Sequence, residues 1–143
     1  MVESKDKKKD VFANIASNFS TQDIRSVYKF TRVLGTGHFG TVRLGAPKTD
    51  EKNVVGIKSI LKESIKKDIK NLEEELFIMA QVDHPNIIKF HESYLDHKYV
   101  HIVMEYCSGG ELFDHIVKHT NFTEGYASKL MKQMISSIKH LHE

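Results

Sequence analysis

The sequence predicts an α+β fold in which five short strands and one long helix come first and further helices follow. Five β-favouring segments lie before residue 105. One amphipathic segment with helical period separates the third of them from the fourth. Past Met104 the hydrophobic period changes to that of helices for the rest of the chain.

The composition is that of an ordinary globular domain. The chain has 143 residues, of which 40% are hydrophobic and 28% charged, and its net charge of +2 does not favour a nucleic acid as partner. No apolar run approaches the roughly 20 residues that cross a bilayer, so no transmembrane segment is expected. The single cysteine, Cys107, cannot form an internal disulfide. We therefore expect a cytoplasmic protein.

Residues 1–27 form a polar, lysine-rich extension that we expect to be partly disordered. Its basic cluster lies at residues 5–9 and is interpreted as a solvated tail. Near the end of the extension, residues 18–24 could start a short helix with Ser20 or Thr21 as its cap.

A glycine-rich segment comes after the first strand-like segment, residues 28–34. Its glycines, Gly35, Gly37 and Gly40, have the spacing GxGxxG. Glycines let a backbone approach phosphate oxygens closely, because they have no Cβ and adopt positive φ at little cost. Chance spacing in an ordinary hairpin is the alternative explanation. The residues after Gly40 therefore decide how the glycines are interpreted.

Dinucleotide-binding proteins share this glycine spacing, but in them the chain passes from the glycines directly into a helix. Here residues 41–44 alternate polar and apolar side chains, which predicts the second strand of a hairpin. The third strand, predicted over residues 53–60, carries Lys58 within an apolar run, where a lysine needs an anionic partner. A glycine loop, a strand and then a strand with a lysine is the order found in protein kinases, so this order disfavours a nicotinamide-binding domain.

A long helix is predicted over residues 63–82, and two strands over residues 87–94 and 99–104. The helix carries three consecutive glutamates, Glu73, Glu74 and Glu75. At 100° per residue, Glu74 lies opposite the apolar stripe and the other two lie on its flanks. If one of them pairs with Lys58, periodicity excludes only Glu74.

The last part of the chain is predicted to be helical. Residues 107–110 form a flexible connector, residues 111–118 a short helix, and residues 123–143 a longer one with Thr123 as its cap. Apolar residues recur on one face of the last helix: Ala127, Leu130, Met131, Met134, Ile138 and Leu141. Because nothing in the sequence covers this face, we expect self-association or disorder of this piece by itself.

Together these motifs resemble the N-terminal half of a eukaryotic serine/threonine protein kinase, over residues 28–143. Residues 83–88 and 109–114 are most similar to the calcium/calmodulin-regulated group, and especially to the calcium-dependent kinases of plants and protozoa. The resemblance implies a kinase N lobe over residues 28–106, with a five-stranded antiparallel sheet and one long helix. The hinge and the first helices of an incomplete C lobe would follow over residues 107–143.

The resemblance also implies ATP as a ligand and a role for individual residues. Lys58 would hold the α- and β-phosphates, and Glu75 would orient Lys58, because its distance from Pro85 matches the kinase pattern. The other implied nucleotide contacts are the flap glycines Gly35, Gly37 and Gly40, the adenine-slot residues Leu34, Val42 and Gly56, the gatekeeper Met104, the backbone of Glu105 and Cys107, and Glu111 at the ribose.

Three of these positions carry a qualification. Kinases usually have alanine at the position of Gly56, so the adenine slot would be slightly roomier here. Met104 is equally explained by core packing, which a gatekeeper also does. Glu111 could instead be a first-turn acid that stabilises a helix dipole.

Phosphoryl transfer needs further groups that residues 28–143 do not supply. Kinases use an aspartate to accept the substrate proton, and an asparagine and a second aspartate to hold magnesium, but the HRD, DFG and APE motifs do not occur here. We therefore expect the chain to be a fragment that is inactive alone. The magnesium ligands, and any calcium-binding EF-hands, would lie outside it, and the full-length kinase would act on protein substrates. A pseudokinase or a nucleotide-sensing scaffold is the alternative.

Overall fold

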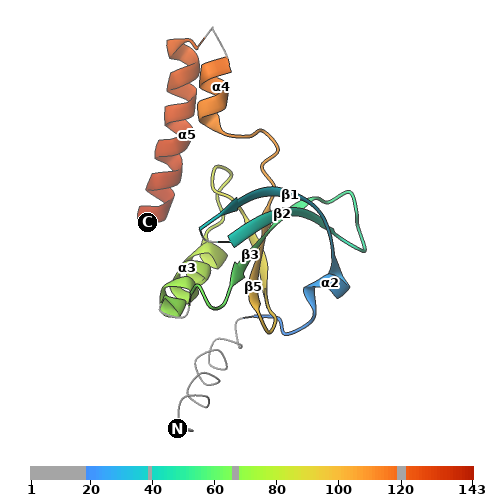
Figure 1. Ribbon diagram of the computed structural model, residues 1–143. Coiled ribbons are helices and arrows are strands. Elements are labelled where there is room, and N and C mark those ends of the chain that lie inside the picture. Colours follow the sequence, from blue (N-terminus) through green and yellow to red (C-terminus); the bar gives the residue numbers. More distant parts are fainter. Residues whose placement is uncertain (1–18, 39, 66–67, 119–121) are drawn as a thin grey trace.

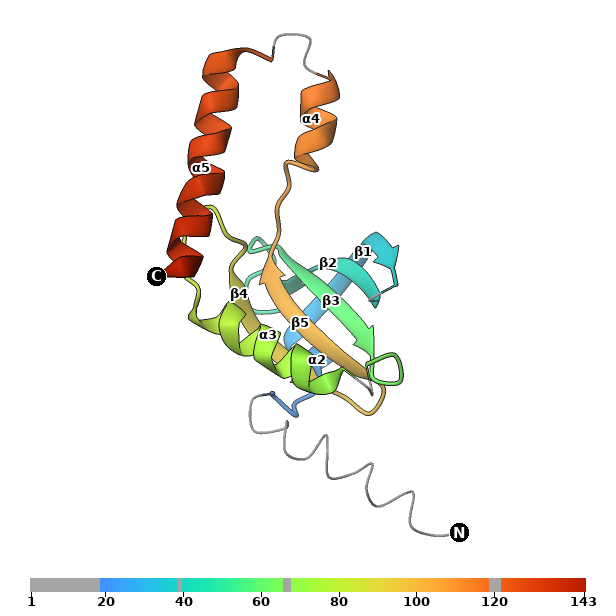
Figure 2. The ribbon, with the colours of Figure 1, turned by 90° about the vertical axis from the view of Figure 1, so that its left-hand side faces the viewer.

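The computed structural model describes residues 19–38, 40–65, 68–118 and 122–143. Within them a five-stranded sheet has helix α3 against one side, and helices α4 and α5 stand beyond the end of the sheet (Figures 1 and 2). This arrangement confirms the α+β class and the order of five strands followed by helices. In chain order the elements are α2 (Ile24–Val27), β1 (Tyr28–Gly37), β2 (Gly40–Pro47), β3 (Val55–Leu61), α3 (Ile69–Gln81), β4 (Phe90–Leu95), β5 (Tyr99–Glu105), α4 (Leu112–Lys118) and α5 (Glu124–His142).

The sheet has the strand order β1-β2-β3-β5-β4, and every neighbouring pair is antiparallel. It curves so strongly that its two edge strands meet. The hydroxyls of Tyr28 on β1 and Tyr94 on β4 both donate to Oε1 of Glu92, at 2.5 and 3.0 Å. Burial, together with this carboxylate, raises the pKa of both phenols, that of Tyr94 to about 12. The neutral phenols thus help to close the sheet.

Two clusters of buried side chains lie on opposite faces of the sheet, because side chains alternate along each strand. The inner cluster, on the concave face where the edges meet, contains Ile24, Tyr28, Val55, Ile57, Tyr94 and Val103. The helix-side cluster contains Phe19, Ile60, Ile65, Leu72, Leu76, Val100 and Ile102, and it is the one that α3 covers. Strand β3 contributes to both clusters and is the most buried strand of the sheet.

Helix α3 begins at Ile69, whereas the sequence predicted a start at residue 63. A turn comes after β3 instead, in which both the backbone N–H and the hydroxyl of Ser64 donate to the carbonyl of Leu61. This turn places Ile65 in the helix-side cluster. Strand β4 also begins later than predicted, at Phe90, since the N–H of Ile87 closes a turn with His84.

The helix caps show one wrong prediction and one correct one. The cap of α2 is Asp23, whose carboxylate accepts from the N–H of Arg25 at 2.9 Å, and not Ser20 or Thr21. Ser20 is engaged in a bridge to β4 instead. The predicted cap of the last helix is confirmed, because the hydroxyl of Thr123 accepts from the N–H of Tyr126 at 3.2 Å.

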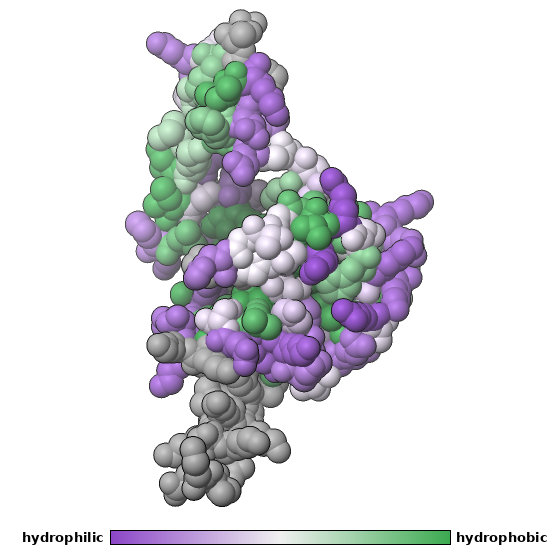
Figure 3. Space-filling view, in the orientation of Figure 1, coloured by the Kyte–Doolittle hydropathy of each residue, from purple (hydrophilic) through white to green (hydrophobic). Residues whose placement is uncertain are grey.

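Helices α4 and α5 bury none of their residues. Hydrophobic side chains are visible along α5 at the upper left of Figure 3. Helix α5 contacts the α3–β4 loop through polar groups: Nε2 of His84 lies 3.0 Å from the hydroxyl of Ser136, and Ser137 donates to the carbonyl of Asn86 at 3.2 Å. In the described part of the chain, no helix has the length and apolar character needed to cross a membrane.

Candidate functional site

The glycine segment forms the turn between β1 and β2, as predicted. Gly37 pairs with Gly40 at the end of the hairpin, and β2 continues directly from Gly40. Because the chain enters a strand and not a helix after the glycines, the dinucleotide-binding interpretation is excluded.

The three glycines differ in whether the fold requires a glycine at their position. Gly40 has φ +116°, and a Cβ at this position would overlap the carbonyl oxygen of Ser59 on β3. Gly35 and Gly37 have no positive φ, and a Cβ on either would meet no heavy atom within 4 Å. Packing therefore explains only Gly40. At the other two positions the space beside the backbone is open, which suits the close approach of a ligand.

The strand register brings several predicted site residues together on one face of the sheet. Val42 on β2 lies opposite Lys58 on β3, and Gly56 lies opposite Met104 on β5. Directly opposed residues of antiparallel strands point to the same face. We call Val42, Gly56, Lys58 and Met104 the cleft patch. Since Lys58 alternates with Ile57 and shares its face with Ile60, the patch lies on the side that α3 covers.

The register also adds a residue that sequence analysis did not single out. Leu44 lies opposite Gly56, so it borders the cleft patch. The alternation of Val42 and Leu44 in the sequence was the signal that could have identified it. The position of Leu34 is less determined by pairing, because it falls at a shift of register between Val33 and Gly35.

Gly56 has room for a methyl group. A Cβ on Gly56 would lie 3.6 Å from Cγ of Met104, which is ordinary van der Waals contact. Met104 itself is half-buried and packs against the helix-side cluster. A methyl group would thus fit on Gly56 beside Met104, and Met104 is a core residue as well as a member of the cleft patch.

Helix α3 presents Glu73 and Glu75 on different flanks. Glu73 is half-buried and lines a small pocket with Phe90 and Ser93 of β4. Its flank of the helix therefore faces β4, an edge strand that β5 separates from β3. Glu75 is exposed and lies on the other flank of the buried Leu76, away from this pocket. An ion pair between Glu75 and Lys58 stays a prediction.

The segment after β5 places the remaining predicted residues. The N–H of Glu105 donates to the carbonyl of Lys89 at 2.8 Å, so a ligand contact at Glu105 would have to use its carbonyl oxygen. Cys107 is exposed in the connector. Glu111 directly precedes α4, and its carbonyl accepts from the N–H of His115 at 3.2 Å. Glu111 thus lies at a helix start, which is compatible with both of its interpretations.

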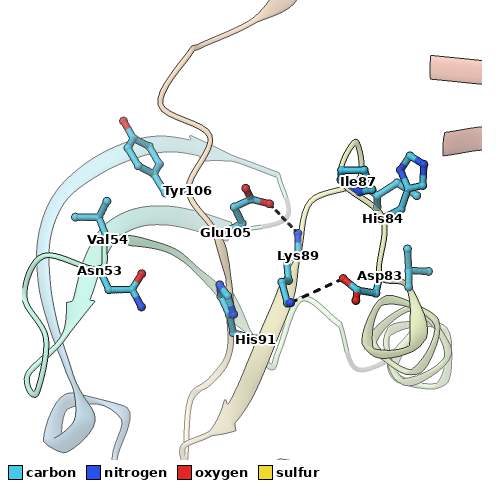
Figure 4. A pocket seen from close by; sticks show the side chains of 11 residues that line it. Asn53, Val54, Asp83, His84, Ile87, Lys89, His91, Glu105 and Tyr106 are labelled. Carbon is cyan, nitrogen blue, oxygen red and sulfur yellow. Dashed lines mark hydrogen bonds and ion pairs between the residues drawn. The ribbon is translucent and has the colours of Figure 1, made fainter. Parts of the chain in front are cut away.

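A cavity of about 540 Å³ lies between the connector and the α3–β4 loop (Figure 4). Its charged groups include Lys89 and Asp83, whose Nζ and Oδ1 are 3.8 Å apart. Among the residues predicted to meet a nucleotide, Glu105 alone is in its lining. This cavity is therefore distinct from the cleft patch.

A buried serine, a buried histidine and a partly exposed aspartate form a hydrogen-bonded chain elsewhere in the sheet. The hydroxyl of Ser59 lies 2.8 Å from Nδ1 of His101, whose Nε2 lies 2.9 Å from Oδ2 of Asp96. Burial acts to raise the pKa of Asp96, but the hydrogen bonds from His101 and from two backbone N–H groups outweigh it and lower the pKa. Because Ser59 is only 6% exposed, a substrate cannot reach its hydroxyl, and the chain of bonds fastens β3 to the β4–β5 turn.

Comparison with known proteins gives consistent matches. The model of the protein kinase domain family matches residues 28–143. A calcium/calmodulin-dependent protein kinase type 1 from Macrobrachium nipponense is 38% identical over 84% of this chain and 35% of its own length. Calcium-dependent protein kinase 5 from Plasmodium falciparum is 41% identical over 86% of the chain and 22% of its own length. Calcium-dependent protein kinase 14 from Arabidopsis thaliana is 40% identical over 85% of the chain and 23% of its own length. The chain thus spans about a third or less of these relatives.

Proposed function

The chain belongs to the protein kinase family, and from this premise we propose that it is the ATP-binding part of a longer serine/threonine kinase. That kinase would transfer the γ-phosphoryl group of MgATP to hydroxyl groups of protein substrates. The names of the relatives support calcium regulation of the longer protein. Residues 28–143 would bind the nucleotide.

The cleft patch beneath the glycine hairpin is the observation that carries this proposal. The hairpin leaves open space beside Gly35 and Gly37. The register places Lys58 of β3 and Val42 of β2 on the same face of the sheet. A backbone without Cβ atoms and a nearby ammonium group together suit a chain of phosphates. Gly56 and Met104 extend the same face toward the connector, where an adenine ring would lie against apolar groups.

Glu75 is the carboxylate best placed to orient Lys58. Glu75 lies on the flank of α3 away from the pocket beside β4, whereas Glu73 lines that pocket. A lysine on a flexible stem must be fixed before it can hold two phosphates in place. A carboxylate on the adjacent helix does this by an ion pair.

The bound MgATP would supply the reactive phosphoryl group and the divalent cation. Residues 28–143 would position the nucleotide through the hairpin backbone, Lys58 and the carbonyl of Glu105. Among the described residues, no cluster of three or more metal-ligating side chains occurs, and the family pattern assigns the magnesium ligands to sequence other than this.

The test is phosphorylation of a basic peptide by the full-length protein. Lys58→Met is expected to lower kcat/KM by at least about 100-fold, because the transition state loses its fixed cation. Lys52→Met is the matched control, since Lys52 is an exposed lysine in the turn before β3. It should leave the rate unchanged.

Two outcomes would contradict the proposal. Undiminished transfer by Lys58→Met would remove Lys58 from the site. A full-length wild-type protein that binds ATP with Lys58 but transfers no phosphate would favour the alternative, a pseudokinase or nucleotide-sensing scaffold.

A further inference from the structure

We propose that Phe19 is a positioning residue that holds α3, and with it Glu75, in the place from which the carboxylate can reach Lys58. The inference rests on the proposed function of Lys58 and Glu75. It assigns a role in that site to the segment before the first strand, which lies outside residues 28–143 of the family match.

The backbone around Phe19 is attached to the edge of the sheet. The N–H of Ser20 donates to the carbonyl of Ser93 at 2.9 Å, and the N–H of Leu95 donates to the carbonyl of Ser20 at 2.9 Å. These two bonds form a parallel bridge between Ser20 and Tyr94 on β4. The segment is therefore fixed to a rigid strand, which gives the neighbouring side chain a defined position.

The ring of Phe19 lies in the angle between β4 and α3. It is 7% exposed and belongs to the helix-side cluster with Leu72 and Leu76 of α3. It also lines the small pocket that Leu76 and Phe77 of α3 share with Phe90 of β4. Phe19 thus links the helix to the strand to which its own backbone is bonded.

The N-terminus of helix α3 has little stabilisation of its own. The side chain of its cap residue, Asp68, makes no capping hydrogen bond, and the first turn contains no acidic residue. Phe77 and Ile78 are 65% and 56% exposed, so much of its apolar surface is not used for packing. A helix of 13 residues is marginal by itself in water. Its position must therefore come from the side chains of the helix-side cluster that pack beneath it, and Phe19 is one of them.

A substitution of Phe19 should consequently change the position of Glu75 relative to Lys58. Glu75 directly precedes Leu76, which packs in the same cluster as Phe19. Loss of the ring would let this part of α3 shift toward β4 and carry Glu75 away from β3. A misplacement of about 1 Å can lower a rate on the order of 100-fold.

The test compares Phe19→Ala with Ile24→Ala in the full-length protein. Both are buried apolar residues in the segment before β1, but Ile24 lies in the inner cluster, on the sheet face opposite α3. Steady-state kinetics are measured at a temperature at which circular dichroism shows both variants folded. Phe19→Ala should lower kcat about 10- to 100-fold with a smaller change in the KM of the peptide. Ile24→Ala should lower the melting temperature and keep kcat.

A second readout is amide hydrogen exchange in residues 69–81, which requires no catalysis. Exchange there should become faster in Phe19→Ala and stay unchanged in Ile24→Ala. Phe19→Leu, which keeps most of the apolar volume, should restore both kcat and protection, and it also serves if Phe19→Ala does not fold.

Equal kcat values for the two alanine variants, or unchanged protection of α3 in Phe19→Ala, would overturn the inference. A wild-type protein without transfer, or an active Lys58→Met variant, would instead overturn the proposed function. The exchange measurement still decides the role of Phe19 in that case.

Discussion

The sheet and the C-terminal helices both carry regular apolar patterns in sequence, alternating in the strands and helical in the helices, but they differ in burial. Ile57 and Val103 on β3 and β5 are fully buried. Met131, Ile135 and Ile138 recur with helical spacing on α5, yet each is more than half exposed. Periodicity thus predicts which face of an element is apolar, but the partner that covers the face has to come from elsewhere in the fold.

The two regions also differ in how their contacts are made. Within the sheet, every strand is paired with its neighbours, and the two packed clusters hold β3 and β5 on both faces. Helix α5 contacts the rest of the described chain through polar groups at His84 and Asn86. Stability should therefore reside in the sheet, and α5 should tolerate substitution.

The largest expected effect is the contrast between two isoleucines. Ile57→Ala should lower the free energy of unfolding by about 2–5 kcal/mol, because it leaves a cavity in the inner cluster. Ile138→Ala, at a side chain that is 53% exposed, should change it by no more than about 0.5 kcal/mol. Urea unfolding followed by circular dichroism measures both.

If Ile57→Ala does not fold, Ile57→Val serves in its place, with an expected loss of about 0.5–1.5 kcal/mol. Equal losses at positions 57 and 138 would mean that α5 packs as tightly as the sheet, and the comparison would fail.

A smaller loss is expected at the hairpin. Gly40→Ala should lower the free energy of unfolding by about 1–3 kcal/mol, because φ +116° is strained for alanine and Cβ would press on Ser59. Gly37→Ala is the matched control and should cost nothing in stability. The same unfolding experiment decides, and equal losses would show that the hairpin backbone differs from the one described.

The range of each interaction decides how far the fold could be predicted from the sequence. The hairpin, the lysine strand and the Thr123 cap were predictable because they depend on neighbouring residues. The start of α3 was not, since the turn at Ser64 and the burial of Ile65 depend on packing against the sheet.

For the site, the glycine hairpin and Lys58 could be placed on adjoining strands from the sequence. The choice between Glu73 and Glu75 could not be made from periodicity, because both flank the apolar stripe. The pocket beside β4 is a tertiary feature, and it shows that the flank of α3 that carries Glu73 faces β4. The burial of Phe19 was missed for the same reason, as it comes from a segment remote in sequence from α3.

An acid-dependent effect should appear at the β4–β5 turn. The folded state lowers the pKa of Asp96, so its carboxylate stabilises the fold above the unfolded pKa of about 3.9 and loses this effect as the pH falls through the folded pKa. The difference in unfolding free energy between wild type and Asp96→Asn should be at most about 1 kcal/mol near pH 6, since the carboxylate is partly exposed. It should shrink below pH 4, and a difference that grows on acidification would contradict the assignment.

The smallest expected effect is a gain. Gly56→Ala should raise the free energy of unfolding by about 0.5–1 kcal/mol, because alanine restricts the unfolded chain and its methyl group fits against Met104. Thermal unfolding measures the gain. A loss would show that β3 and β5 lie closer together at this position than described.

The central claim is that the amine of Lys58 meets the phosphates of ATP beneath the hairpin. An acyl phosphate of ATP tests it most directly. The amine of a lysine beside the phosphates attacks the acyl carbon, ATP leaves, and the acyl group stays on the lysine as an amide. Mass spectrometry of the labelled full-length protein should find Lys58 modified, with the label lost when excess ATP competes and exposed lysines such as Lys52 unaffected by that competition. Labelling of Lys58 that ATP does not reduce, or ATP-sensitive labelling at surface lysines in its place, would contradict the account.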